Sequence, residues 1–391
     1  MNTFGQDMKE MLHKIPGEAK KPIDRTIVIV IAVLTCFGFI MVWSASMYNA
    51  NLDDDAYYYV SKQVIYAIIG FAGMFAVSLI DFRFVKKYSF LLMLLSLALL
   101  GIVMLLPETE GVNGAVRWIT IGGIVIQPSE LAKVAVLLYL ADEIEKRQDK
   151  IGSITNFFKL LIFCGSICLL IYFQPALSTA VVVAGLIIGM YFMAGGNLTY
   201  VLSIIGIGGA MVYVFISSSA WRMARIWAYL DPWSDLYGNG WQPAQSLMAL
   251  GSGGIFGVGI GNGKAKLLFL PEPQNDYIFS VIGEELGLIG CLMLLSLYLY
   301  LIFKLIQISF RCPDMFSKLV SSGMGLLLSI QVFINVAVVT NLIPSTGVTL
   351  PFISAGGSSL VSLLLSFGVV LNISRNLKKQ KKSSNTRSIV E

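Results

Sequence analysis

Charged residues are scarce in this chain of 391 residues, and their scarcity excludes a soluble globular protein. Only 13% of the residues are Asp, Glu, Lys or Arg, whereas 56% are hydrophobic. A soluble domain usually devotes about 25% of its residues to charge. Lipid must therefore cover much of this protein.

Histidine and cysteine are also rare. The only histidine, His13, lies in the N-terminal tail, so acid–base chemistry within the membrane must rely on carboxylates, Tyr or Lys. The five cysteines show neither a disulfide framework nor a zinc-binding spacing. The sequence thus excludes a disulfide-stapled domain and gives no sign of a zinc site.

Long apolar runs are what the sequence has in abundance, and several reach the roughly 20 residues that span a bilayer. They predict an all-α fold, a polytopic integral membrane protein with about ten transmembrane helices. The fourth span is the weakest, because it is short and contains Lys133. The expected spans are 26–47, 63–80, 88–106, 130–142, 154–173, 176–194, 198–218, 278–303, 318–341 and 358–374.

The distribution of basic residues predicts that both chain termini are cytoplasmic. With ten spans, 21 of the 28 Lys and Arg residues fall on the side of the termini, as cytoplasmic loops require. The expected organisation is a cytoplasmic tail (1–25), a ten-span membrane domain (26–375) and a basic cytoplasmic tail (376–391). Two long loops, 107–129 and 219–277, would lie outside, and the second is the large extracytoplasmic loop.

A few basic residues fall on the outer side against this rule. Arg222, Arg225, Lys264 and Lys266 share the loop 219–277, and Arg117 lies in the other long loop. Such a set suits an anionic ligand, because Arg and Lys favour phosphate. The alternative is contact with anionic lipid headgroups, which also places phosphate at the outer face.

Glu130 and Lys133 are charged residues at the start of the weak fourth span. Their spacing places them on one helix face. Charges within spans are costly and usually functional. The alternative is an ion pair that only holds helices together.

Asp276 is the candidate general base. Pro271 and Pro273 make the approach to it non-helical, and it stands at the mouth of the eighth span, where partial desolvation raises a carboxylate's pKa. The alternative is an ordinary helix N-cap. Glu284 and Glu285, about two turns deeper, are expected either to bind a cation or to pair with the basic cluster.

The stretch 344–359 joins the last two predicted spans at the outer face. Its serines, threonines and glycines, Ser354 among them, suit re-entrant backbone packed within protein.

Several motifs in order resemble the SEDS family (shape, elongation, division and sporulation), whose members are polytopic bacterial proteins that polymerise peptidoglycan strands from lipid II. The resemblance covers about residues 30–375 and is closer to the FtsW-like division and sporulation branch than to the RodA-like branch. The matching pieces are Gly114-Ala115-Val116-Arg117-Trp118-Ile119, Gln127-Pro128-Ser129-Glu130 with Lys133, Asp231-Pro232-Trp233, Gln245-Ser246-Leu247, Gly251-Ser252-Gly253-Gly254, Leu270-Pro271-Glu272, Asp276 with Ile278-Phe279, Gly283-Glu284-Glu285, and Pro351-Phe352-Ile353-Ser354 with Gly356-Gly357-Ser358-Ser359.

The resemblance implies a role for each matching residue. Asp276 takes the position of the family's essential aspartate, the proposed catalytic base. Arg117, Glu130 and Lys133 match charged positions associated with the substrate cavity. The full substrate-binding set expected here is Arg117, Glu130, Lys133, Lys264, Lys266, Glu284 and Ser354.

The sequence departs from the family pattern at three places. Ala176 stands where the family usually has Asp, Ala265 where it has Gln, and Gln274-Asn275 where it has His-Thr. Ala176 removes a carboxylate near the outer face and puts full activity, and any metal site it supports, in question.

The expected function is glycosyl transfer between two lipid II molecules during division or sporulation, at the septum of the bacterial cell membrane. A divalent cation, Mg²⁺ or Mn²⁺, is expected to assist the departure of undecaprenyl pyrophosphate. The expected partners are lipid II, a class B penicillin-binding protein and other divisome proteins, with no nucleic acid. Two alternatives stay open: a lipid II flippase that uses the same basic residues, and an inactive division scaffold.

Overall fold

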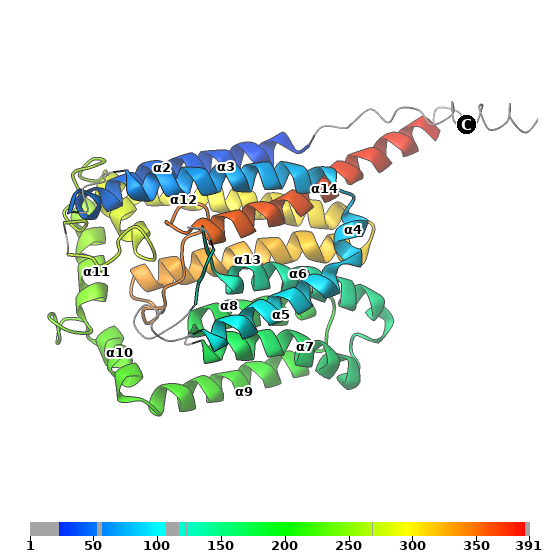
Figure 1. Ribbon diagram of the computed structural model, residues 1–391, viewed down its shortest axis with the longest axis horizontal. Helices are drawn as coiled ribbons and strands as arrows, with labels where there is room; N and C mark the ends of the chain where they lie inside the picture. The colour runs from blue at the N-terminus through cyan, green and yellow to red at the C-terminus, as the bar shows by residue number, and fades with distance from the viewer. Residues whose placement is uncertain are drawn as a thin grey trace, which may run out of the picture.

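The computed structural model describes residues 23–52, 57–106, 117–121, 124–174, 176–267 and 269–387. A helix coincides with each of the ten predicted spans, and these helices pack as one bundle (Figure 1). The predicted all-α fold is therefore confirmed. The ten helices are α2 (Arg25–Leu52), α3 (Tyr58–Leu79), α5 (Ser89–Leu105), α6 (Pro128–Lys146), α7 (Ile154–Phe173), α8 (Leu177–Met193), α9 (Leu198–Ser217), α12 (Ile278–Arg311), α13 (Met315–Val339) and α14 (Gly357–Arg387).

Length and apolar character qualify most of these helices to cross a membrane. Helices α2, α3, α7, α12, α13 and α14 are long and apolar enough, and α5, α8 and α9 contain shorter apolar stretches. Their outward-facing side chains are large and apolar; Met211 on α9, for example, is 65% exposed. A surface of this kind is stable against lipid rather than water.

Helix α6, the weak fourth span, is enclosed by the rest of the bundle. Every residue from Ala135 to Ile144 is buried, and the helix packs against α5, α8 and α13. A helix shielded from lipid by its neighbours does not need an apolar surface all round. This explains why its sequence is the least hydrophobic of the predicted spans.

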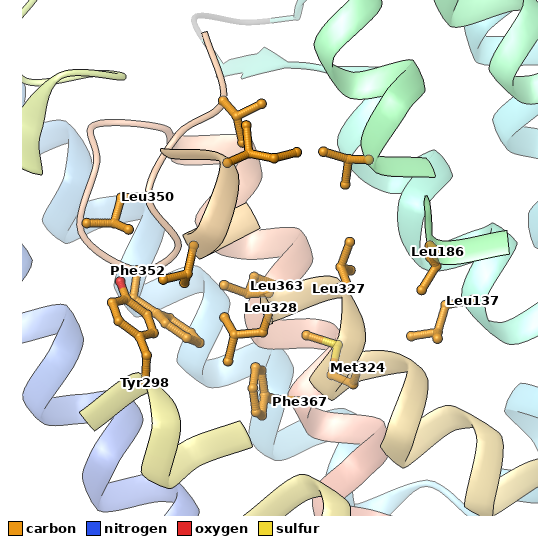
Figure 2. Packing of buried hydrophobic residues seen from close by; sticks show 14 of the residues in the cluster. Leu137, Leu186, Tyr298, Met324, Leu327, Leu328, Leu350, Phe352, Leu363 and Phe367 are labelled. Carbon is orange, nitrogen blue, oxygen red and sulfur yellow. The ribbon is translucent and has the colours of Figure 1, made fainter. Parts of the chain in front are cut away.

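The core lies between α13, α14 and the helices around them. Figure 2 shows buried side chains from these helices meeting those of α6, α8, α12 and the segment 344–356. Gly38 on α2 lets that segment approach closely, because a Cβ there would lie 2.7 Å from the Phe352 carbonyl oxygen. The labelled core residues are Leu137, Leu186, Tyr298, Met324, Leu327, Leu328, Leu350, Phe352, Leu363 and Phe367.

The structure adds elements where the sequence predicted loops. The predicted loop 107–129 contains an antiparallel hairpin, β1 (Ile119–Ile121) with β2 (Ile124–Ile126), whose β-branched residues favour strands. The predicted loop 219–277 contains α10 (Ala220–Leu230) and α11 (Trp241–Gly253). A short α4 (Phe82–Lys87) precedes α5, a 3-10 turn (Gln148–Lys150) follows α6, and α14 continues past residue 375, where the polar tail was expected.

The bundle has two distinct ends. Helices α10 and α11 lie across one of them, called here the α10–α11 end (Figure 1). Helix α4 and the C-terminal part of α14 lie at the other end. Most of the predicted N-terminal tail, residues 388–391 and the motif piece 114–116 lie outside the described residues.

Candidate functional site

Helix α12 is broken near its start, and a glycine-rich loop fills the break. This loop has glycines two or three residues apart over most of 251–263. Gly287 has φ 66° and ψ −167°, a conformation that only glycine adopts readily. At this break the amides of Val258 and Gly259 donate to the carbonyls of Glu284 and Glu285, at 3.0 and 2.9 Å. The close glycine spacing therefore lets the loop bind α12.

Two adjacent glutamates of α12 hold this loop in place. The Glu284 carboxylate accepts the amides of Lys264 and Ala265 at 2.8 and 3.0 Å. Glu285 forms an ion pair with Lys266 at 2.8 Å, with side-chain exposures of 0% and 4%. The Ser44 hydroxyl of α2 donates to Glu285 at 2.7 Å and accepts from Lys266 at 3.0 Å.

These contacts give two of the predicted substrate-binding residues an internal role. Glu284 and Lys266 are both 4% exposed and contact protein here, and their contact with substrate stays a prediction. Of the alternatives for Glu284 and Glu285, Glu285 takes the ion pair with the basic cluster. Lys264 is exposed, and only its backbone is held by Glu284.

Asp276 is held by its backbone, which leaves its side chain to face the α10–α11 end. Asn335 of α13 donates to the Asp276 carbonyl at 2.8 Å and to the Val348 carbonyl at 2.8 Å. A Cβ on Gly347 would lie 3.7 Å from Asp276 Oδ2. The amide of Ala355 donates to the Gln274 carbonyl at 2.9 Å. The segment 344–356 thus lies beside the carboxylate of Asp276.

The electrostatics around Asp276 link three segments that are distant in the sequence. The pKa of Asp276 is raised from 3.8 to about 6, chiefly because burial disfavours the charged carboxylate; Glu272 adds to the rise and Arg225 opposes it. Burial also lowers the pKa of Arg117, and the charge of Arg225 lowers it further. Arg225 of α10 therefore acts on both Arg117 and Asp276.

Buried polar atoms without hydrogen-bond partners gather around Asp276. Within the part of the chain that the structure describes, Tyr277 Oη, Gln274 Oε1, Asn335 Oδ1 and Thr346 Oγ1 are buried and unpaired. Tyr277 follows Asp276 directly, and its side chain is 0% exposed. Native proteins pair nearly all such atoms, so a cluster of exceptions points to a place where a polar ligand or water belongs.

The other two predicted groups are satisfied within the protein. Glu130 and Lys133 pair at 2.8 Å with side-chain exposures of 10% and 6%. The Ser354 hydroxyl accepts the amide of Leu350 at 2.8 Å inside the segment 344–356. This segment is non-helical, and its residues 350–354 are buried, as the sequence predicted for re-entrant backbone. Both stay predictions as substrate contacts.

Two residues of the site carried weaker signals in the sequence. Arg225 belongs to the outer basic residues of the sequence, but nothing in the sequence distinguishes it from Arg222. Asn335 was not predicted at all, although a polar amide within an apolar span is itself a signal. Tertiary contacts alone reveal which of these residues lie near Asp276.

The described residues do not form a metal site from protein ligands alone. Within the described ranges, no three His, Cys, Asp or Glu side chains gather closely enough to hold an ion. Mg²⁺ is often bound by one or two carboxylates together with substrate phosphates. Glu272 is the acidic residue whose charge raises the pKa of Asp276. Its carboxylate also accepts hydrogen bonds from the side chains of Gln274 and Asn275.

The family of this chain is identified by its similarity to known proteins. The family model described as "Cell cycle protein", which covers FtsW, RodA and SpoVE, matches residues 24–379. The chain belongs to this family. The resemblance noted in the motifs is therefore confirmed, and the chain is a multi-pass membrane protein.

Individual relatives agree with the division and sporulation branch. A protein of Geobacter sp. (strain M18) named "Probable peptidoglycan glycosyltransferase FtsW" is 40% identical over 91% of this chain and 97% of its own length. "Stage V sporulation protein E" of Bacillus subtilis (strain 168) is 41% identical over 90% of this chain and 97% of its own.

Solved structures agree with the fold. A chain from a structure titled "Structural coordination of polymerization and crosslinking by a peptidoglycan synthase complex" has a TM-score of 0.75 and 26% identity, and covers 91% of this chain and 98% of its own. RodA of Thermus thermophilus has a TM-score of 0.69 and 26% identity, and covers 92% of this chain and 99% of its own.

Proposed function

We propose that the protein is a peptidoglycan glycosyltransferase that polymerises lipid II. The observation that carries the proposal is the half-buried Asp276, whose pKa is raised to about 6, lying within electrostatic reach of Arg225, which in turn acts on Arg117. A general base works best with a pKa near the operating pH. The names of the FtsW and SpoVE relatives support the same activity.

The reaction transfers a glycosyl group with inversion at the anomeric carbon. A hydroxyl oxygen of the acceptor sugar forms a bond to the donor's anomeric carbon, and the bond from that carbon to the pyrophosphate breaks. Asp276 takes the hydroxyl proton, and the bonding electron pair leaves with undecaprenyl pyrophosphate. Positive charge must stabilise the growing negative charge on this leaving group, and the candidates from the sequence are Arg117, Lys133, Lys264 and Lys266.

The α10–α11 end would face the outside of the cytoplasmic membrane, with both termini in the cytoplasm. The excess of Lys and Arg at the opposite end supports this orientation. Lipid II presents its sugars at the outer surface, and a bundle that spans the bilayer accommodates the long lipid tails of donor and product. We place the protein at the division septum or at the site of spore cortex synthesis.

A divalent cation would assist the departure of the pyrophosphate. Because the described residues form no acidic cluster, substrate phosphates would have to complete its coordination, with Glu272 as the protein ligand. Bound there, Mg²⁺ or Mn²⁺ would neutralise phosphate charge. Binding of Mn²⁺ to the protein with undecaprenyl pyrophosphate, followed by electron paramagnetic resonance, should weaken in Glu272→Gln.

A class B penicillin-binding protein is the proposed partner, alongside other division proteins. The similarity to a chain of a peptidoglycan synthase complex supports this partnership. The partner would crosslink the strand that this protein extends.

The direct test is incubation of the purified full-length protein with lipid II, with and without a class B penicillin-binding protein. We expect glycan strands of many disaccharides, resolved by gel electrophoresis. A flippase would instead move fluorescent lipid II across a liposome bilayer without forming strands, and an inactive scaffold would do neither. Absence of strands under conditions in which a known polymerase forms them would reject the proposal.

A further inference from the structure

We infer that Arg225 of α10, together with Arg117, binds the pyrophosphate of the lipid-linked donor beside Asp276. The inference rests on the proposed polymerase function and adds a residue to its substrate site. Of the outer basic residues that the sequence offered as an anion-binding set, it selects Arg117 and Arg225.

The lysines first considered for this role are engaged elsewhere. Lys266 is buried against Glu285, and Lys133 is buried against Glu130, each at 2.8 Å. A buried ion pair gives up its partner only at the cost of leaving an uncompensated charge. Lys264 is exposed on the loop that Glu284 ties to the broken start of α12.

Contacts at the C-terminal end of α10 hold this helix against the segment that leads to the site. The Tyr229 hydroxyl donates to the Leu342 carbonyl at 3.2 Å, and Asn341 donates to the Tyr229 carbonyl at 3.0 Å. These bonds dock α10 onto the start of the segment that continues to Gly347, beside Asp276. Arg225 precedes Tyr229 by four residues and so lies on the same face of α10.

Arg117 and Arg225 bring two positive charges near the carboxylate of Asp276. Burial lowers the pKa of the Arg117 guanidinium, and the charge of Arg225 lowers it further. The side chain of Arg225 itself is exposed. Such a pair suits an anion with two phosphate groups, because each guanidinium donates two parallel hydrogen bonds to phosphate oxygens.

The unpaired hydroxyl of Tyr277 independently points to a ligand in the same place. Its oxygen is fully buried, has no hydrogen-bond partner among the described residues, and feels the charges of Asp276 and Arg225. A phosphate oxygen or a sugar hydroxyl beside Arg225 would satisfy it.

The test measures equilibrium binding of undecaprenyl pyrophosphate to the full-length protein in nanodiscs, which does not require polymerisation. Undecaprenyl monophosphate and phosphatidylglycerol serve as comparison ligands. Arg225→Ala should weaken binding of the pyrophosphate about 10- to 100-fold, as expected for lost hydrogen bonds to a charged group. It should also remove the preference for pyrophosphate over monophosphate.

Two further variants separate charge from folding. Arg225→Lys keeps the charge but loses the paired hydrogen bonds, so its affinity should lie between those of the wild type and Arg225→Ala. Arg222→Ala removes a charge from the same helix, at a residue whose guanidinium lies 3.5 Å from Ser218 Oγ, and should change affinity by less than about twofold. Thermal unfolding of each variant in detergent shows whether it is folded.

Three results would overturn the inference. One is unchanged pyrophosphate affinity in folded Arg225→Ala and Arg225→Lys. Another is an equal loss of phosphatidylglycerol binding, which would assign Arg225 to lipid headgroups. The third is an altered pH profile of polymerisation with unchanged affinity, which would make Arg225 only an electrostatic partner of Asp276. A wild type that binds the pyrophosphate but forms no strands would reject the polymerase function and leave the arginine site standing.

Discussion

Two carboxylates close in sequence, Asp276 and Glu285, have opposite surroundings at the start of α12. Glu285 is 0% exposed, and Lys266 and Ser44 bind its oxygens at 2.7 to 2.8 Å. Asp276 keeps a partly exposed side chain, and its neighbours leave several polar atoms unpaired. A carboxylate with a full set of partners holds structure together, whereas one with open coordination can accept a proton from a substrate.

The Glu285 side of this comparison predicts the largest effect on stability. Lys266→Met should lower the free energy of unfolding by about 3–5 kcal/mol, because it leaves Glu285 buried without a counter-charge. Lys266→Met combined with Glu285→Gln should recover much of the loss. Thermal unfolding in detergent measures both, and the exposed Lys264→Met is the control. Equal stability of the single and double variants would show that the pair does not act as a unit.

The break in α12 predicts the next largest effect. Gly287→Ala should destabilise the protein by about 1–3 kcal/mol, because φ is positive there and a Cβ would lie 2.4 Å from the Gly257 amide nitrogen. Gly251→Ala, in α11 with open space around it, should be neutral or stabilising. If both changes have the same effect, the loop does not depend on the glycine at the break.

The Asp276 side predicts a pH dependence of polymerisation. With its pKa raised to about 6, the rate should fall about tenfold for each pH unit below 6 and level off above it. The profile of Glu272→Gln should keep this shape with its midpoint at lower pH, because the charge of Glu272 adds to the raised pKa of Asp276. A rate independent of pH between about 4.5 and 7 would contradict a base with this pKa.

The same shift has a defined sign for stability. A folded-state pKa above the ordinary value of 3.8 means that the folded protein holds the proton more tightly than the unfolded chain. The contribution of Asp276 is fully present below about pH 4 and is lost as the pH rises towards 6. Asp276 is thus a residue at which function opposes stability.

Ala176 predicts the smallest effect. It is the N-cap of α8, 6% exposed, and makes no side-chain cap bond. Ala176→Asp should therefore stabilise α8 by about 1 kcal/mol and should raise polymerisation or its dependence on Mg²⁺. Ala176→Asn caps the helix without the charge and separates the two effects. Unchanged rate and cation dependence would make this position dispensable here.

The sequence was sufficient to predict the helices, because apolar length and charge asymmetry are local properties. It predicted the weak fourth span correctly from the placement of charges, although α6, being enclosed by other helices, has too low a hydropathy to stand out. It missed α10, α11 and the hairpin β1–β2, whose stability depends on the surfaces they cover. Short elements outside the bundle carry no long apolar run that would reveal them.

The site was only partly predictable for a related reason. Asp276 and Arg117 stood out through their position and the family resemblance. The pairing of Lys266 with Glu285 and Ser44 joins residues from two helices and a loop, which spacing along the chain does not reveal. Arg222 and Arg225 are both arginines of α10, and only the folded structure shows that Arg225 acts on Asp276.

The most direct measurement of the central claim is the polymerisation rate of Asp276→Asn with purified lipid II at matched protein levels. Asparagine is nearly isosteric with aspartate, and Asn335 holds the backbone carbonyl at this position, so folding should survive. Loss of the base should lower strand yield about 10²–10⁴-fold. An N-cap role would leave the rate nearly unchanged. A folded Asp276→Asn protein with more than about half the wild-type rate would contradict the account and turn attention to Glu272.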